Sequence, residues 1–157
     1  MKKLGVIIIC TSTFLFAVAQ AKKPRQAKKT VAAKSKAKAT IAKPTTSKQR
    51  GAVVYKTYCV TCHQVDGGGV QHLNPPLAEA SAVVGNDKAK IIKIVLNGMT
   101  SKEEIDGEVY GNNMAPHNFL NDQQVADVLT FVRSNFGNKA SAVTVAEVKK
   151  VRAAGKK

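Results

Sequence analysis

Three residues near the middle of the sequence form a pattern that can hold an iron porphyrin. Cys59 and Cys62 stand three positions apart, and His63 follows the second cysteine directly. On one helical turn the two thiols can each add to one of the two vinyl groups of a haem, and the adjacent imidazole can take one axial position on the iron. We therefore predict that Cys59 and Cys62 form thioether bonds to one haem c and that His63 binds its iron.

Other chemistry for these residues fits the sequence less well. A disulfide between the two cysteines would suit an exported protein, but a redox-active Cys-x-x-Cys pair normally opens a helix after a strand, and no strand pattern precedes Cys59. A structural zinc ion needs four ligands, and there is no second cysteine pair. His72 and His117 lie at spacings unlike those of zinc fingers. A chance match to a five-residue pattern is the third alternative.

The second axial ligand must come from elsewhere in the chain. Met114 lies in a loop between two apolar segments, where a thioether can reach the iron face opposite His63. Met99, after a helix end, is more typical of a side chain that fills a gap in the core, and His72 is typical of a loop histidine. His117 is the main alternative, and a bis-histidine site would have a lower reduction potential. We expect His63 and Met114 to be the axial ligands.

The basic charge of the 157-residue chain lies at its two ends. Lys and Arg number 25 against 10 Asp and Glu, a net charge of +15. Residues 22–50 and 138–157 carry this excess, whereas residues 51–137 are slightly acidic. A nucleic-acid-binding domain needs a basic face on its folded part, so we expect no nucleic-acid partner. The basic ends instead favour electrostatic contact with an acidic partner protein or an anionic membrane surface.

The N-terminal segment resembles a secretory signal, and a polar segment follows it. Residues 1–21 have a basic start, an apolar run and small residues at a cleavage position, which predicts export to the periplasm. If the signal is not cleaved, the chain is membrane-anchored instead. Cleavage would remove Cys10 and leave two cysteines. Residues 22–50 combine low hydrophobicity with unopposed positive charge, so we expect a disordered Lys/Ala-rich linker.

The remaining sequence contains helical patterns and no convincing strand alternation. Helices are predicted over residues 49–58, 87–97 and 122–135, and the last has Asn121 as its cap with Gln124 three residues on. Gly98 is predicted to cap the end of the second helix. Residues 138–157 form a basic tail with a short helix after Thr144, either laid against the domain or loose in solvent.

Residues 51–137 are too few to build a large core from side chains alone. A domain of this size buries only roughly 60–65% of its unfolded surface, so a metal, a disulfide or a large apolar cofactor is needed to fill its centre. The predicted fold is therefore all-α, with three to four helices wrapped around one covalently bound haem.

From about Gly51 to Gly137 the sequence resembles class I c-type cytochromes, the small bacterial monohaem kind. In that family the first helix crosses the last one, and a proline carbonyl accepts a hydrogen bond from the ligand histidine. The family also has an axial methionine segment ahead of its closing helix. One departure is that Ala115 separates Met114 from the proline that usually follows the ligand. The matching residues are Gly51, Tyr55, Cys59, Cys62, His63, Pro75, Leu77, the 112–116 segment and the 120–133 segment.

This resemblance implies a function in electron transfer rather than catalysis. Iron held by one imidazole and one thioether has no open coordination site, and this ligation raises the potential. The resemblance therefore implies a periplasmic monohaem cytochrome that carries single electrons between a donor oxidoreductase and a terminal oxidase or reductase, with these redox proteins as its partners. The alternatives are a haem-based sensor or ligand-binding module, and an accessory electron-transfer subunit of a larger dehydrogenase complex.

Overall fold

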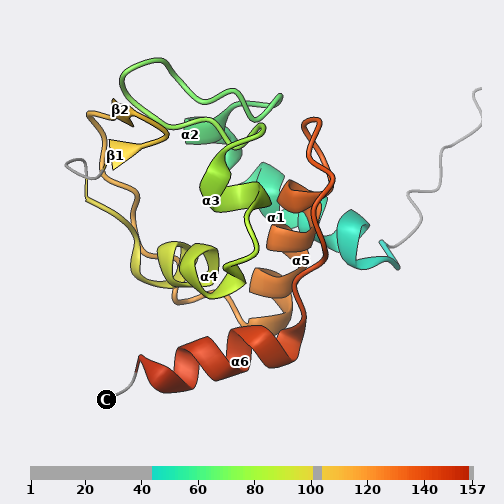
Figure 1. Cartoon of the computed structure of the whole chain (residues 1–157). Coiled ribbons are helices and arrows are strands. Elements are labelled where there is room, and N and C mark those ends of the chain that lie inside the picture. The colour runs from blue at the N-terminus through green and yellow to red at the C-terminus, as the bar shows by residue number, and fades with distance from the viewer. Residues whose placement is uncertain (1–43, 101–103, 156–157) are drawn as a thin grey trace, which may run out of the picture. The chain divides into compact units, whose positions relative to one another are not determined.

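Two twelve-residue helices, α1 (Ser47–Tyr58) and α5 (Asp122–Arg133), pack against each other at the centre of the fold (Figure 1). The computed structural model describes residues 44–100 and 104–155. Both helices begin with a capping box, Thr46 with Gln49 and Asn121 with Gln124, in which each pair satisfies backbone N–H groups at the helix start. The other elements are α2 (Val60–His63), α3 (Ser81–Val84), α4 (Lys88–Asn97), β1 (Glu104–Ile105), β2 (Glu108–Val109) and α6 (Val145–Ala154).

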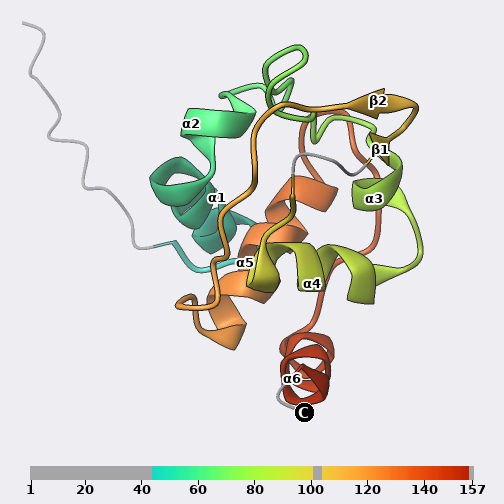
Figure 2. The same cartoon turned by 90° about the vertical axis from the view of Figure 1, so that its left-hand side faces the viewer.

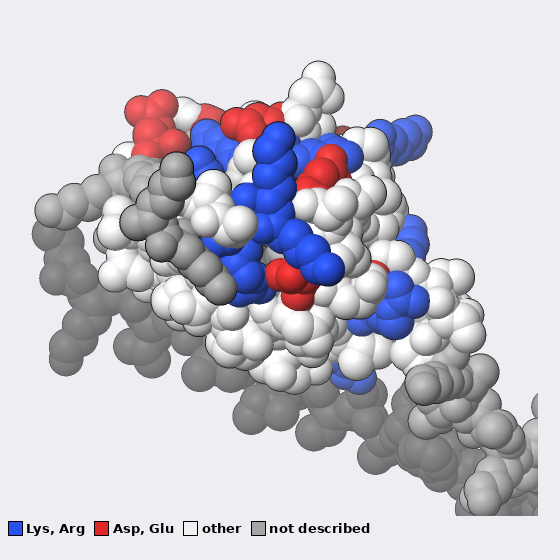
Figure 3. Space-filling view, turned by 90° about the horizontal axis from the view of Figure 1, so that it is seen from below, with Lys and Arg blue, Asp and Glu red and all other residues white. Residues whose placement is uncertain are grey.

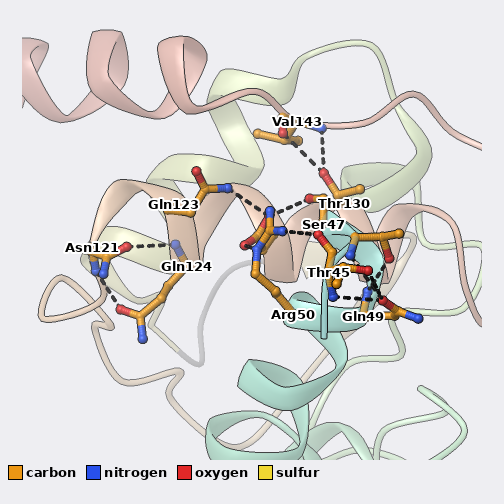
Figure 4. A network of polar contacts seen from close by, with 11 residues as sticks. Thr45, Ser47, Gln49, Arg50, Asn121, Gln123, Gln124, Thr130 and Val143 are labelled. Atoms are coloured by element: carbon orange, nitrogen blue, oxygen red, sulfur yellow. Dashed lines mark hydrogen bonds and ion pairs between the residues drawn. The ribbon is translucent and has the colours of Figure 1, made fainter. Parts of the chain in front are cut away.

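The crossing of α1 and α5 depends on one glycine and one buried carboxylate. A methyl group on Gly51 would come within 2.0 Å of the backbone oxygen of Asp127, so only glycine allows the helices to approach this closely. The Asp127 carboxylate accepts hydrogen bonds from Ser47 at 2.5 Å, from Arg50 at 2.6 and 2.8 Å, and from Gln123 at 2.9 Å (Figure 4). These bonds fix α1 on α5 and so fix the point at which the cysteine segment leaves α1.

The predicted helices and the predicted fold class are confirmed. The first two predicted helices correspond to α1 and α4, and the third to α5. Gly98 ends α4, with its N–H bonded to the Ile94 carbonyl. Up to residue 137 the described chain has three helices of ten residues or more and two single-turn helices, which matches an all-α domain of three to four principal helices.

The expectation that this region has no strand is wrong in one place. β1 and β2 form a two-residue antiparallel hairpin, with Glu104 opposite Val109 and Ile105 opposite Glu108. Asp106 and Gly107 join them, with φ of 52° and 86°. Positive φ at both turn residues is typical of the type I′ turn that Asp-Gly favours, so this dipeptide was the available signal. Two-residue strands are too short to show alternation.

The N-terminal limit of the domain differs from the expected one, and at the C-terminal end the structure favours one of the two alternatives that the sequence leaves open. Residues 46–50 were expected to belong to the disordered linker, but they cap and begin α1. The expected tail after residue 137 is packed onto the domain: Asn138 is buried and donates to the Leu77 and Val132 carbonyls, and Val148 in α6 is fully buried. Thr144 caps α6 through a capping box with Glu147, so this helix is the one expected after Thr144.

The expected signal sequence and most of the expected linker lie outside the described residues. Within the part of the chain that the structure describes, no helix is both long enough and apolar enough to cross a membrane.

Candidate functional site

The two cysteines and the histidine lie on one short helix that follows α1 almost without interruption. Cys59 ends α1 and also begins α2, and the His63 N–H bonds the Cys59 carbonyl at 3.0 Å. The Tyr55 hydroxyl donates to the Gln64 carbonyl at 2.6 Å and so ties the end of α2 back to α1. One helical turn therefore carries both thiols and the imidazole, as the spacing predicts.

The Cys59 thiol does not have the electrostatics of a redox-active cysteine. Burial, and then the neighbouring Cys62, raise the pKa of the Cys59 thiol to about 11. A catalytic Cys-x-x-Cys pair needs a lowered thiol pKa, because the thiolate is the nucleophile. Cys59 is half-buried, and Cys62 is exposed. The disulfide oxidoreductase alternative is therefore disfavoured.

His63 is buried, and its ring is oriented by a backbone carbonyl. Its Nδ1 lies 3.0 Å from the Pro75 oxygen. A carbonyl only accepts hydrogen bonds, so Nδ1 carries the proton and Nε2 keeps its lone pair. Burial lowers the pKa of His63, although the bond to Pro75 opposes this, and the charge of His117 lowers it further. A neutral imidazole with a free Nε2 is the form that binds iron.

Met114 is held by a backbone pair with Met99. The Met99 N–H donates to the Met114 carbonyl at 3.0 Å, and the Met114 N–H donates to the Met99 carbonyl at 2.8 Å. Directly opposed residues of an antiparallel pair present their side chains on the same face. Met99 therefore stands beside Met114 rather than apart from the site.

The two remaining histidines are placed differently. His117 lines the same cavity as His63 and Met114, and its Nδ1 lies 2.8 Å from the Ala115 oxygen. The carbonyl can only accept a hydrogen bond, so Nδ1 of His117 carries a proton. His72 does not line the cavity; its Nδ1 lies 2.8 Å from a Glu108 carboxylate oxygen and its side chain is 71% exposed. The structure thus brings His117 to the site and leaves His72 outside it.

These groups share one cavity of about 350 Å³ with mainly apolar walls. Its volume lies within the range of cofactor sites. The walls come from α3, α4, α5 and the loops between them, while the sulfur and imidazole groups come from α2 and the methionine pair. Residues lining it include Cys59, Cys62, His63, Pro75, Leu77, Val83, Ile91, Val95, Met99, Met114, His117, Leu120, Val128, Leu129 and Val132. An apolar pocket lined by two thiols, two imidazoles and two thioethers fits a covalently held haem.

Gly98 supports the site in two ways, and the sequence indicates only the first of them. Gly98 was predicted to end a helix, and it does so with φ of 74°. A methyl group on Gly98 would also come within 2.3 Å of the Met114 oxygen. Gly98 is therefore needed for the close approach of the methionine loop, and the pairing that requires it involves residues too far apart for a local pattern to reveal.

Zinc finds no site among the described residues. Within residues 44–100 and 104–155, no three His, Cys, Asp or Glu side chains are grouped so that they could hold a metal ion.

Comparison with known proteins places the chain in a family. The sequence profile described as Cytochrome c matches residues 48–136. The chain is 35% identical to the cytochrome c subunit of the quinone alcohol dehydrogenase of Gluconacetobacter polyoxogenes, over 73% of this chain and 25% of that protein. It is 39% identical to the gluconate 2-dehydrogenase cytochrome c subunit of Pantoea cypripedii, over 63% and 23%. It is 30% identical to cytochrome c-552 of Thermus thermophilus, over 66% and 84%.

The chain belongs to the cytochrome c family. The cofactor of this domain is covalently bound haem c with iron, and cytochrome c domains transfer electrons. The predicted resemblance to class I c-type cytochromes is confirmed. The chain spans about a quarter of the length of the dehydrogenase subunits that it matches.

Proposed function

We propose that this protein is a monohaem electron carrier in the periplasm, cycling between a donor oxidoreductase and a terminal oxidase or reductase. The observation that carries the proposal is the neutral, carbonyl-oriented His63 in the same apolar cavity as Met114. Bound haem would supply a ferrous–ferric couple. His63 and Met114 would occupy both axial positions, and the apolar walls would exclude water and disfavour the extra positive charge of the ferric state.

Electrons would enter and leave near the cysteine segment. Cys62 is exposed. Tyr58, four positions before it, is 43% exposed, and its ring lies 5.3 Å from the ring of Phe119, which is 62% exposed. Tyr58 also lines the cavity. A small apolar surface of this kind suits the weak, transient encounters typical of redox partners.

An accessory role in a larger dehydrogenase complex is the second candidate. Relatives at 33–39% identity are cytochrome subunits of alcohol, gluconate and fructose dehydrogenases. We propose that basic segments of this chain would dock such a partner through an acidic surface, or contact an anionic membrane. Lys and Arg also gather on the face of the folded domain seen from below in Figure 3, where α6 lies. If the protein co-purifies with a dehydrogenase and the two separate at high salt, this role would be favoured over that of a free carrier.

The ligand assignment is tested by spectroscopy of protein produced with haem-maturation machinery and export. Mass spectrometry should show one haem on the exported chain. The ferric protein should have the weak far-red absorption band typical of sulfur ligation. Met114→Ala should abolish this band, whereas Met99→Ala and His117→Ala, which alter neighbouring cavity residues, should retain it.

The opposite pattern would contradict the proposal. Loss of the band in Met99→Ala alone would make Met99 the ligand, and its absence from the wild type would favour His117. Carbon monoxide binding to the reduced wild-type protein without denaturant would favour a sensor. Exported chain without haem would overturn the proposed carrier.

A further inference from the structure

The C-terminal helix α6 lies beyond the stretch matched by the family profile, yet it is joined firmly to the domain. The profile ends at residue 136, and α6 begins at Val145. Val148 on its inner face is fully buried, and Lys88 of α4 bonds Glu147 at 3.0 Å. Figures 1 and 2 show α6 at the end of the domain away from α2, so it does not touch the cysteine segment.

Arg152 of α6 binds the segment that leads from Met114 into α5. Arg152 Nε lies 2.7 Å from the Asp122 carboxylate, Nη1 donates to the Asn118 carbonyl at 3.0 Å, and Nη2 donates to the Leu120 carbonyl at 2.7 Å. The Arg152 and Asp122 side chains are only 23% and 24% exposed. A planar guanidinium with three acceptors in fixed positions restrains orientation as well as distance.

The segment that Arg152 binds, from Asn118 to Leu120, is the second half of the loop that carries Met114. At its start, Met114 is paired with Met99, and the His117 N–H donates to the Val95 carbonyl of α4 at 2.9 Å. At its end, Leu120 is 2% exposed and lines the same cavity as Met114. Without Arg152, the carbonyls of Asn118 and Leu120 would have only solvent as a replacement for the guanidinium. In Figure 2 the chain between β2 and α5 runs down the near side of the domain, outside the central helices.

We propose that Arg152 is a positioning residue for the sixth iron ligand. It fixes the loop from Asn118 to Leu120 and thereby limits how far Met114 moves from the iron. In this arrangement α6 supports only the methionine side of the site, because Arg152 has no contact with the segment from Cys59 to Pro75. The inference rests on the proposed ligation by Met114.

The test measures how readily Met114 is displaced in the haem-loaded protein. Imidazole binding to the ferric protein requires the methionine to leave, so its rate reports the freedom of the loop. Arg152→Ala should bind imidazole about tenfold faster, as expected for losing charged hydrogen bonds of modest net strength. Arg152→Lys, which keeps the charge and part of the bonding, should be intermediate.

Two control variants separate this effect from a general loosening of α6. Lys149→Ala removes one positive charge from an exposed position on the same helix. Glu147→Gln weakens the contact of α6 with Lys88 while keeping a side chain that completes the capping box. Both should bind imidazole at the wild-type rate. Equal acceleration in either control would overturn the assignment to Arg152.

A second measurement does not depend on which residue binds iron. Hydrogen exchange in the holoprotein should rise in Arg152→Ala at the amides of His117 and Leu120 and stay unchanged in α2. Unchanged exchange at both amides would overturn the proposal even if the rate changed. If Arg152→Ala does not fold, the same comparison is made with Arg152→Lys. A wild type that holds haem but lacks the far-red band would refute Met114 ligation, and the exchange result would still decide whether Arg152 fixes the loop.

Discussion

The two sides of the haem site are supported in different ways. The histidine side is local: Cys59, His63 and the Pro75 carbonyl lie within seventeen consecutive residues, and the bond between His63 and Pro75 spans twelve positions. The methionine side is assembled from distant segments, with Met114 paired to Met99 and its loop held by Arg152. The proposed ligand His63 is therefore positioned by the motif that contains it, whereas the proposed ligand Met114 is positioned only by the completed fold.

Among the changes that separate the two sides of the site, Gly98→Ala should have the largest effect. It introduces a side chain at a φ of 74°, with its Cβ 2.3 Å from the Met114 oxygen. We expect the free energy of unfolding to fall by about 2–4 kcal/mol. Because only the methionine side is distorted, covalent haem should remain while the far-red band weakens. Denaturant unfolding and the ferric spectrum measure the two effects.

Gly107→Ala is the matched control for this change. Gly107 also has a positive φ, 86°, but nothing lies within 4 Å of the added methyl group. In Gly107→Ala the free energy of unfolding should fall by only about 1 kcal/mol, and the far-red band should remain. If both variants lost the band equally, backbone strain rather than contact with the Met114 oxygen would explain the loss.

A change at Asp127 should lower the stability by less, and it should affect the histidine side and the methionine side together. Burial raises the pKa of Asp127, but hydrogen bonds from Arg50, Ser47 and Gln123 outweigh it, so the pKa lies below its ordinary value of 3.8. A carboxyl with a lowered folded pKa stabilises the fold above its unfolded pKa, and this contribution is lost as the pH falls through the folded pKa. Asp127→Asn should therefore lower the stability by about 1–2 kcal/mol near neutral pH.

The difference between the two proteins should shrink as the solution is acidified below pH 3.8, the ordinary aspartate value. Guanidinium unfolding of wild type and Asp127→Asn at several pH values provides the measurement. Because Asp127 joins α1 to α5, the cysteine segment and the methionine loop should loosen together. A constant difference across this pH range would exclude the carboxylate as the source of the effect.

The smallest expected effect separates the stability of α6 from the role of Arg152. Thr46 and Thr144 cap α1 and α6 with equivalent capping boxes. Replacing either with Ala should lower the free energy of unfolding by about 1 kcal/mol. Neither change should accelerate imidazole binding, because neither removes a bond between Arg152 and the methionine loop. Acceleration in Thr144→Ala would mean that the packing of α6 as a whole, rather than Arg152, supports the methionine side.

The sequence was sufficient for features that depend on neighbouring residues. The capping residues Asn121 and Gln124 marked the start of α5, and the spacing of Cys59 and His63 defined the attachment turn. The hairpin at Asp106-Gly107 carried a usable turn signal that strand alternation alone missed.

Features that depend on distant pairing could not be derived in this way. The placement of α6 against the domain, and with it the role of Arg152, depends on which of many basic residues meets Asp122. Met99 looked like a core side chain because its partner Met114 is fifteen positions away and linked only through the fold. The helical period of a segment predicts that it is amphipathic, but it does not say which face of the domain receives it.

The pairing of α1 with α5 has a consequence for the order of events during biosynthesis. Ser47 and Asp127, which bond across this interface, are eighty positions apart. A chain made from its N-terminus therefore presents its cysteines long before the helix that encloses them exists. In that open state nothing buries Cys59, whose pKa then has its ordinary value of 9.0 rather than about 11. The Cys59 thiol is thus more easily deprotonated before the fold encloses it than afterwards.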